Sequence, residues 1–308
     1  MFETIMVVDY SASSRPKTGK DTIWLGVIRA PFEGVELYNP PTRFRLSEII
    51  KAVVKDSVDD QHRALLALDF AISYPASFIE TFYRCTRGLA THEDSNPFSV
   101  NLLPTEIVHL YLYLERSVVD DSKNRNNRFD VASELNRAIG QRVFWGHPTR
   151  HSSQPWLYAH KDKRSLELIG EYRNCDQGAR TISGRRFISS PFQLYGAGSV
   201  GSQSILGIAR LMRLARELQD QGVAIDLWPY PMQSIAPAPL TLCEWWPSMI
   251  QLPDVYNGPK DRQQVICSCK YLSKLQDSGE LTQLLNDRIL DKDNPSYLEG
   301  AILGVPFK

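Results

Sequence analysis

The sequence has no excess of charge of either sign and no long apolar stretch. Lysine plus arginine and aspartate plus glutamate number 35 each among 308 residues, so the formal net charge is zero. This neutrality does not favour a large nucleic-acid footprint or an anionic membrane surface as a partner. No run of 18 apolar residues occurs, and the first residues lack a basic segment followed by a long apolar one. We therefore expect no membrane segment and no secretory leader.

Cysteine is scarce, and several motifs are missing. The five cysteines are odd in number and include no C-x-x-C pair, which argues against a zinc knuckle or a disulfide framework and favours a reducing, cytoplasmic environment. A G-x-S-x-G elbow is also absent, so Ser-His-Asp catalysis has no support. His147 and His151 are four residues apart, but Pro148 lies between them, which argues against a shared helical zinc site.

The sequence does contain the alternation of apolar runs that is typical of an α/β domain. Short runs at 4–9, 22–29 and 35–38 predict three strands. Their close spacing favours antiparallel pairing, because a parallel pair needs a crossover of about a dozen residues. A helix with Ser47 as its N-cap follows, and residues 64–70 (ALLALDF) predict a strand buried on both faces.

The later part of the chain predicts further helices and one more strand. The helices are expected at 77–87, 202–218 and 259–274, and the strand at 240–244. A proline-rich segment, 229–239, predicts a rigid connection before that strand. The resulting expectation is an α/β fold with a mixed five-stranded sheet and flanking helices. Its core comprises residues 1–87 and 240–308, and a large, mostly helical insertion, 88–239, caps the strand ends.

Four acids stand where a site would assemble. Asp9, Asp69 and Glu244 each end, or nearly end, a predicted strand, and Asp261 begins the late helix above its apolar stripe. Taken singly, each acid could be a strand-end cap or an ion-pair partner. Together in one partly buried place they would repel one another, and a divalent cation would remove that repulsion. Oxygen ligands alone suit Mg²⁺ or Mn²⁺, and two such ions about 3.5–4 Å apart can clamp a phosphoryl group.

The order of three strands, a helix and a strand, with acids at Asp9, Asp69 and Asp261, resembles the ribonuclease H-like superfamily. More closely, the chain resembles the family called domain of unknown function 429, whose members are predicted ribonuclease H-fold nucleases. The segments that carry the resemblance are VVDYSAS, ALDFAISYP, FQLYGAGSVGSQ, CEWWPS, KDRQQV and LEGAILGVP. The resemblance implies cleavage of a phosphodiester in a nucleic acid or a small phosphate-containing substrate. It also implies that Asp9, Asp69, Glu244 and Asp261 are catalytic metal ligands. Tyr10 and Phe70, beside two of the acids, depart from the pattern expected of the family.

Basic residues and serines near the acids are candidates for holding a flanking phosphate. Lys17, Lys20 and Arg262 lie close to the proposed ligands in sequence, although a solvated surface role is the alternative. Actin-like ATP-dependent phosphotransferases also place an acid after the first strand, followed by a phosphate-gripping hairpin. In that interpretation Ser11, Ser13 and Lys17 would bind phosphate. Those enzymes need a duplicated domain, and this chain contains one copy of the strand-rich pattern.

A second alternative is a dinucleotide site in YGAGSVGSQ. Gly196, Gly198 and Gly201 satisfy G-x-G-x-x-G, and Asp226 follows at roughly the expected distance. Against it, the preceding strand would consist only of FQLY, and a glycine turn that lets a helix pack closely explains the same residues. The turn could still offer backbone N–H groups to a substrate phosphate. A non-catalytic binding protein that kept the fold and some of the acids is a third alternative.

Overall fold

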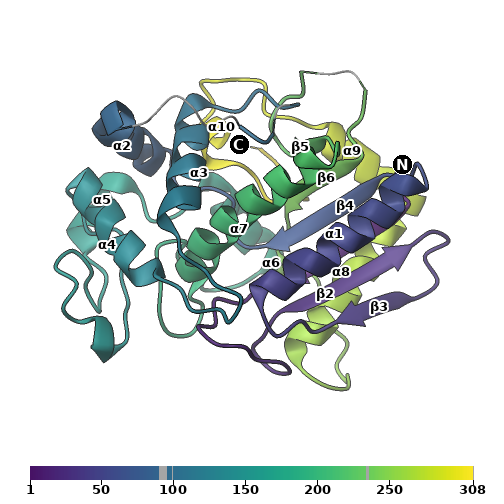
Figure 1. Cartoon of the computed structure of the whole chain (residues 1–308), viewed down its shortest axis with the longest axis horizontal. Helices are drawn as coiled ribbons and strands as arrows, with labels where there is room; N and C mark the ends of the chain where they lie inside the picture. The colour runs from purple at the N-terminus through teal and green to yellow at the C-terminus, as the bar shows by residue number, and fades with distance from the viewer. Residues whose placement is uncertain (90–95, 99, 234–235, 308) are drawn as a thin grey trace.

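The computed structural model describes residues 1–89, 96–98, 100–233 and 236–307 (Figure 1). Its centre is a mixed sheet of six strands in the order β3-β2-β1-β4-β6-β5. The strands are β1 (Thr4–Asp9), β2 (Trp24–Arg29), β3 (Val35–Tyr38), β4 (Ala64–Asp69), β5 (Ile225–Leu227) and β6 (Leu240–Glu244). Strand β2 is antiparallel to β1 and β3, whereas β1, β4, β6 and β5 are mutually parallel. The predicted antiparallel start and the mixed sheet are confirmed.

The sheet has one strand more than the five expected. The additional strand is β5, which pairs in parallel with β6 at the edge of the sheet. It contains three residues and follows a glycine turn, so it lacks the length that marks a strand in a sequence. Strand β5 lies within 88–239, so this segment contributes to the central sheet as well as to the helices around it.

Helices cover both faces of the sheet. Helices α1 (Arg43–Asp59) and α7 (Val200–Asp220) contribute to the core on one face, and α8 (Lys260–Asp277) and α9 (Glu280–Asn286) to the core on the other. Alternation along each strand separates the two cores, because successive side chains project to opposite faces. In β1, for example, Val8 belongs to the core beneath α1 and α7, and Val7 to the core beneath α8.

The remaining helices gather beside α7, on the side toward which β4 points (Figure 1). They are α2 (Ala76–Thr86), α3 (Thr105–Ser117), α4 (Arg128–Ile139), α5 (Lys163–Ile169) and α6 (Asn174–Ser183), with α10 (Ser296–Glu299) near the C-terminus. Tyr74, Phe78, Phe144 and Phe192 form an aromatic cluster among them, with ring centroids 5.1–5.6 Å apart. This arrangement places most of the helical mass near the carboxyl ends of the parallel strands.

Helix α1 begins five residues before the expected position. Its N-cap is Thr42, whose hydroxyl accepts a hydrogen bond from the backbone N–H of Arg45 at 3.1 Å. Ser47, the predicted cap, lies inside the helix and donates to the carbonyl of Arg43. Both residues have a side chain suited to capping, and the helix starts at the one that directly follows two prolines.

Glycines allow α8 and α7 to approach the sheet closely. A Cβ atom on Gly26 of β2 would lie 2.6 Å from Val265 and 2.7 Å from Cys269 of α8. These two residues belong to the predicted apolar stripe of α8, and both are fully buried. On the other face, a Cβ on Gly207 of α7 would lie 2.7 Å from the ring of Phe70. These contacts therefore fix the distance of each helix from the sheet, whose strand ends carry the acids.

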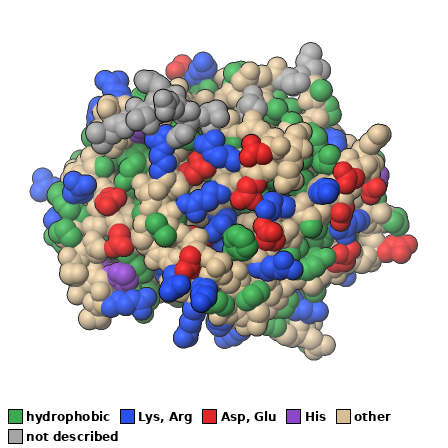
Figure 2. Space-filling model, viewed as in Figure 1, with side chains coloured by type: hydrophobic (Ala, Val, Ile, Leu, Met, Phe, Trp, Pro, Cys, Tyr) green, Lys and Arg blue, Asp and Glu red, His purple; other side chains and the backbone are tan. Residues whose placement is uncertain are grey.

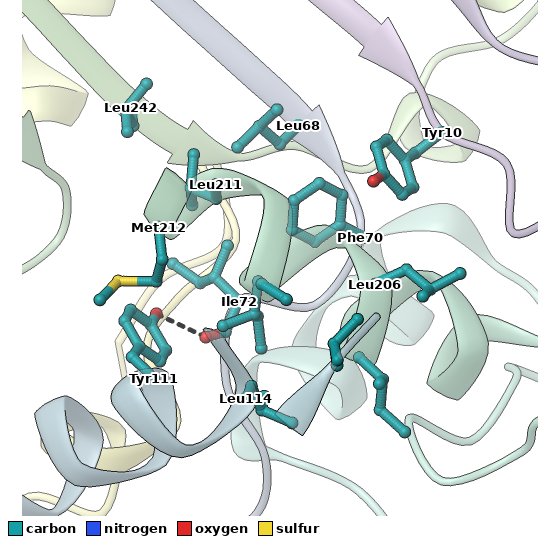
Figure 3. Packing of buried hydrophobic residues seen from close by; sticks show 14 of the residues in the cluster. Tyr10, Leu68, Phe70, Ile72, Tyr111, Leu114, Leu206, Leu211, Met212 and Leu242 are labelled. Atoms are coloured by element: carbon teal, nitrogen blue, oxygen red, sulfur yellow. Dashed lines mark hydrogen bonds between the residues drawn. The ribbon is translucent and has the colours of Figure 1, made fainter. Parts of the chain in front are cut away.

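The chain immediately after β4 is anchored in the core (Figure 3). The rings of Tyr10 and Phe70 lie 4.9 Å apart, and the hydroxyl of Tyr111 on α3 donates to the carbonyl of Ile72 at 2.6 Å. Tyr10 and Phe70 are buried in the core beneath α7, and they directly follow Asp9 and Asp69. These two aromatic residues therefore hold the strand ends in place.

The surface shows no large area of one charge on the face in Figure 2, where basic and acidic side chains alternate. This distribution agrees with the balanced composition. Within the described ranges, no helix is both long enough and apolar enough to cross a bilayer.

Candidate active site

Asp9 and Asp69 lie side by side at the carboxyl ends of β1 and β4. Their Cα atoms are paired in the parallel register of the two strands, so both side chains project to the same face of the sheet. That face is the one covered by α8, because Val7 and Ala67, two residues earlier in each strand, pack in the core on this side. Asp9 and Asp69 therefore lie next to each other on one face of the sheet, and the role of the four acids as ligands stays a prediction.

Asp261 approaches the same place from α8. It lies in the first turn of the helix, and the close packing of α8 on Gly26 brings this turn to the end of the sheet where β1 ends. One of its carboxylate oxygens accepts a hydrogen bond from the backbone N–H of Asp21 at 2.8 Å. Asp261 thus connects the helix to the loop between β1 and β2.

The pKa values of the two strand-end acids are displaced upward. Burial, followed by the negative charges of Asp69 and Asp261, raises the pKa of Asp9 well above its ordinary value, although Lys260 opposes the shift. Burial, followed by the charges of Glu244 and Asp261, raises the pKa of Asp69 to about 7. Among the described residues, no group donates a hydrogen bond to either carboxylate and neither forms an ion pair. Two crowded carboxylates are therefore left without a protein partner.

Glu244 lies close to these acids but is differently placed. It ends β6 in register with Leu68, so its side chain projects to the α7 face, opposite to that of Asp69. Its carboxylate accepts hydrogen bonds from both terminal nitrogens of Arg173, at 2.7 and 2.6 Å, and from the backbone N–H of Ile72 at 3.0 Å. Glu244 is thus engaged in a buried bidentate ion pair. The implied set of four equivalent ligands is not assembled in the structure.

The acids at these strand ends carry carboxylate oxygens, which are the donors that Mg²⁺ prefers. Across the described ranges, no group of three or more His, Cys, Asp or Glu side chains is arranged to hold a metal ion. The carboxylates of Asp9 and Asp69 accept no hydrogen bond from the described residues, and that of Asp261 accepts one from the backbone N–H of Asp21. Mg²⁺ characteristically uses one or two carboxylates and completes its shell with water and substrate phosphates. A pair of free carboxylates fits that requirement, whereas a preformed cage is absent from the described residues.

Two adjoining cavities lie over the strand ends. The larger, of about 790 Å³, is lined by Asp9 and Asp261. The smaller, of about 230 Å³, is lined by Asp69 and Glu244. Gln203 of α7 lines both cavities, and its side-chain amide donates to the carbonyl of Tyr10. Asp9 and Asp69 therefore line two separate cavities that share Gln203 as a wall.

The larger cavity, hereafter the acidic-end pocket, also collects most of the predicted phosphate-binding residues. These are Ser11, Ser13 and Lys17 from the loop after β1, and Gly196 and Gly198 from the turn before α7. The exposed side chain of Lys20 and that of Arg262 do not line it. Arg262 instead donates to the carbonyl of Asn257 at 3.2 Å.

A buried arginine that the sequence analysis missed shapes the serine loop. Arg43 donates through one terminal nitrogen to the carbonyls of Ser11 and Ser13, both at 2.9 Å. The rest of its guanidinium pairs with the buried carboxylate of Asp120, which also pairs with Arg210. These partners are 77 to 90 residues apart from Asp120 in the chain, and no local pattern marks them. The serine loop is therefore positioned by long-range ion pairs.

The glycine turn has a packing role that the dinucleotide interpretation does not require. Segment 192–195 contributes no strand to the sheet, and a Cβ on Gly201 would lie 2.6 Å from the carbonyl oxygen of Pro191. Asp226, the expected ribose ligand, is on β5 and forms a buried bidentate pair with Arg288. Gly196 and Gly198 adopt positive φ angles of 97° and 73°, which glycine tolerates best. The turn thus allows the start of α7 to pack closely against the preceding segment, beside the pocket.

Comparisons with family models, with curated proteins and with solved structures found no match.

Proposed function

We propose that this protein is a metal-dependent hydrolase of phosphate esters, with Asp9 and Asp69 as the residues that hold a divalent cation. One observation carries the proposal: two carboxylates in register on parallel strands share one face, with no protein donor among the described residues. Burial first, and then the neighbouring negative charges, raise the pKa values of both carboxylates, so their charged forms carry a free-energy cost in this place. A divalent cation would offset it.

The remaining groups support this assignment. The cation would be Mg²⁺ or Mn²⁺ because the donors are hard oxygens. When bound, such an ion supplies Lewis-acid polarisation of a phosphoryl oxygen. Asp261 would stay in the outer part of the site, held by the N–H of Asp21. Glu244 would be a positioning residue, because its buried pair with Arg173 fixes the end of β6. A second ion would require Glu244 to leave that pair, so the proposal involves one protein-held ion.

The fold supports a ribonuclease H-like assignment for the core. Three antiparallel strands followed by a helix and a parallel central strand, with acids ending the first and fourth strands, are features of that superfamily's pattern. Substrates in this proposal are phosphodiesters of small or structured molecules, since the chain has no formal net charge. The free state of all five cysteine thiols supports a reducing compartment such as the cytoplasm.

The proposal is tested by hydrolysis of a panel comprising bis(p-nitrophenyl) phosphate, short DNA and RNA oligonucleotides and nucleoside triphosphates. Each is assayed with Mg²⁺, with Mn²⁺ or with EDTA. We expect metal-dependent turnover of at least one phosphodiester, and a loss exceeding about 100-fold in Asp9→Asn and in Asp69→Asn. Both variants should remain folded, because each removes crowded charge.

Asp60→Asn is the matched control, since Asp60 is exposed, follows α1 and lines no described cavity. It should keep full activity. Turnover that survives in EDTA, or that is unchanged in Asp9→Asn, would contradict the proposal. Metal binding without hydrolysis of any phosphate ester would favour the non-catalytic alternative.

A further inference from the structure

We propose that the acidic-end pocket contains a subsite for a second phosphate group of the substrate, built around Arg128. This inference rests on the proposed function only where it calls the ligand a substrate. The phosphate site itself is supported by separate contacts. Arg128 begins α4, is 8% exposed and lines the same pocket as Asp9. It was not among the residues that the sequence indicated.

The surroundings of Arg128 differ from those of the other deeply buried arginines. Arg43 pairs with Asp120, and Arg173 with Glu244, so each of those cations has a buried carboxylate beside it. Arg128 hydrogen-bonds only to neutral oxygens, those of Ser202 (2.8 Å), Ser14 (2.9 Å) and Asn126 (2.7 Å). Within the described residues it forms no ion pair. A buried cation without a counter-ion is unfavourable, and an anion in the pocket would relieve this.

One terminal nitrogen of the guanidinium is left without an acceptor among the described residues, and Arg128 lines the pocket. Nε and Nη1 make the three bonds above, while Nη2 donates to no described residue and is not enclosed by protein. Burial, followed by the nearby charge of Arg43, lowers the pKa of Arg128 to about 10, so it remains protonated at neutral pH. A planar donor of this kind suits phosphate oxygens.

The glycine turn supplies further donors on the same side. Among the described residues, the four consecutive backbone N–H groups of Gly196 to Ser199 have no acceptor, and these residues line the pocket ahead of the 21-residue helix α7. Ser202 connects the two parts, because its hydroxyl accepts from Arg128 and donates to the carbonyl of Leu194 at 2.6 Å. Arg128 and the turn thus form one unit with positive potential.

The exposed side chains of Arg15 and Lys17 add positive charge at the rim of the pocket. Asp9, Asp21 and Asp261 line the same pocket, so its lining combines negative and positive side chains. This combination matches a ligand with one phosphate at the cation-binding pair and another held directly by protein donors. The substrate class is therefore a molecule with at least two phosphate groups, such as consecutive phosphates of a nucleic-acid strand or a terminal phosphate beside a diester.

The test is calorimetric titration with inorganic phosphate in EDTA, so that neither catalysis nor a bound metal contributes. Wild type should bind phosphate saturably, and Arg128→Gln should weaken binding by about tenfold or more. Arg137→Gln is the matched control, because Arg137 is exposed on the same helix and lines no described cavity. It should bind like wild type. Lys17→Gln, at an exposed position, should weaken binding only about two- to threefold, as expected for a screened rim charge.

Thermal unfolding without phosphate distinguishes this role from a structural one. If Arg128 serves to bind an anion, Arg128→Gln should unfold at the wild-type temperature or higher. Phosphate should then raise the midpoint temperature of unfolding more in wild type than in the variant. Displacement of phosphate by a short oligonucleotide or by a nucleoside diphosphate would identify the source of the ligand. Absence of phosphate binding to wild type, or equal binding by Arg128→Gln, would overturn the proposal. Either result is independent of whether the Asp9 and Asp69 variants lose hydrolysis.

Discussion

Three neighbouring strand ends carry acids, and the hydrogen-bond partners of these acids differ. At the end of β6, Glu244 is enclosed and neutralised by the guanidinium of Arg173. At the ends of β1 and β4, Asp9 and Asp69 form no ion pair and accept no side-chain hydrogen bond from the described residues, although Lys260 and Arg185 lie near enough to act on their pKa values. The difference follows from the alternation of the strands, which directs Glu244 to one face and the aspartates to the other. A carboxylate with a protein counter-ion stabilises the fold, whereas carboxylates without one are left for a ligand.

The largest effect is expected from breaking the protein-neutralised pair. Arg173→Gln leaves the buried carboxylate of Glu244 without its counter-ion, and the free energy of unfolding should fall by about 3–5 kcal/mol. Urea denaturation measures this change. Arg180→Gln is the control, because Arg180 is exposed on α6, the helix whose N-cap is Arg173. A loss below about 1 kcal/mol, the range of an exposed pair, would remove the contrast with Asp9 and Asp69.

A smaller effect of opposite sign is expected at Asp69. In EDTA, Asp69→Asn should raise the free energy of unfolding at pH 8 by roughly 2 kcal/mol, because it removes a crowded charge. The pKa of Asp69 is about 7 in the folded state, which is higher than in the unfolded state. At a pH between the two pKa values, the folded protein therefore keeps a proton on Asp69 that the unfolded chain has lost. Its contribution to stability is therefore fully present at low pH and is lost as the pH rises toward 7.

Urea denaturation of wild type and Asp69→Asn from pH 4 to pH 8 measures this profile. The variant should lack most of the decline that wild type shows over that interval, while Asp60→Asn should retain it. If Asp69→Asn were less stable than wild type at pH 8, Asp69 would be an acid that stabilises the fold, as Glu244 is.

The smallest effect concerns Asp261. Its charge contributes to the raised pKa values of both Asp9 and Asp69, and Asn can still accept the hydrogen bond from Asp21. Asp261→Asn should therefore shift the midpoint of the stability profile toward lower pH by less than about one unit, with little change in stability at low pH. The same denaturation series detects it. No shift, or a shift upward, would mean that Asp261 does not act on the pair.

The sequence predicted the parts of the site that depend on local pattern. Apolar runs ending in Asp9 and Asp69 indicate buried strands with polar ends, and the stripe beginning at Asp261 indicates a helix packed on the sheet. The face on which each acid projects was harder to predict. Strand β6 is buried on both faces, so the sequence LTLCE does not show which face meets α7 and which meets α8, and the orientation of Glu244 could not be predicted.

Long-range partners were the other missing information. Arg173 is 71 residues from Glu244, and Arg128 is 114 residues from Ser14. Such pairs depend on how the helices between 88 and 239 pack, and no local spacing encodes that packing. Strand β5 was missed for a related reason, because three residues are too few to show a period.

The account depends most on Asp9 and Asp69 being a pair that binds a cation. Calorimetric titration of Mn²⁺ into metal-free protein tests this directly, without a substrate. We predict saturable binding of one ion to wild type and to Asp60→Asn, and loss of that binding in both Asp9→Asn and Asp69→Asn. A concentration of Mn²⁺ about 100 times its dissociation constant should also stabilise wild type by about 2.7 kcal/mol. No binding to wild type, or equal binding to Asp9→Asn, would contradict the account.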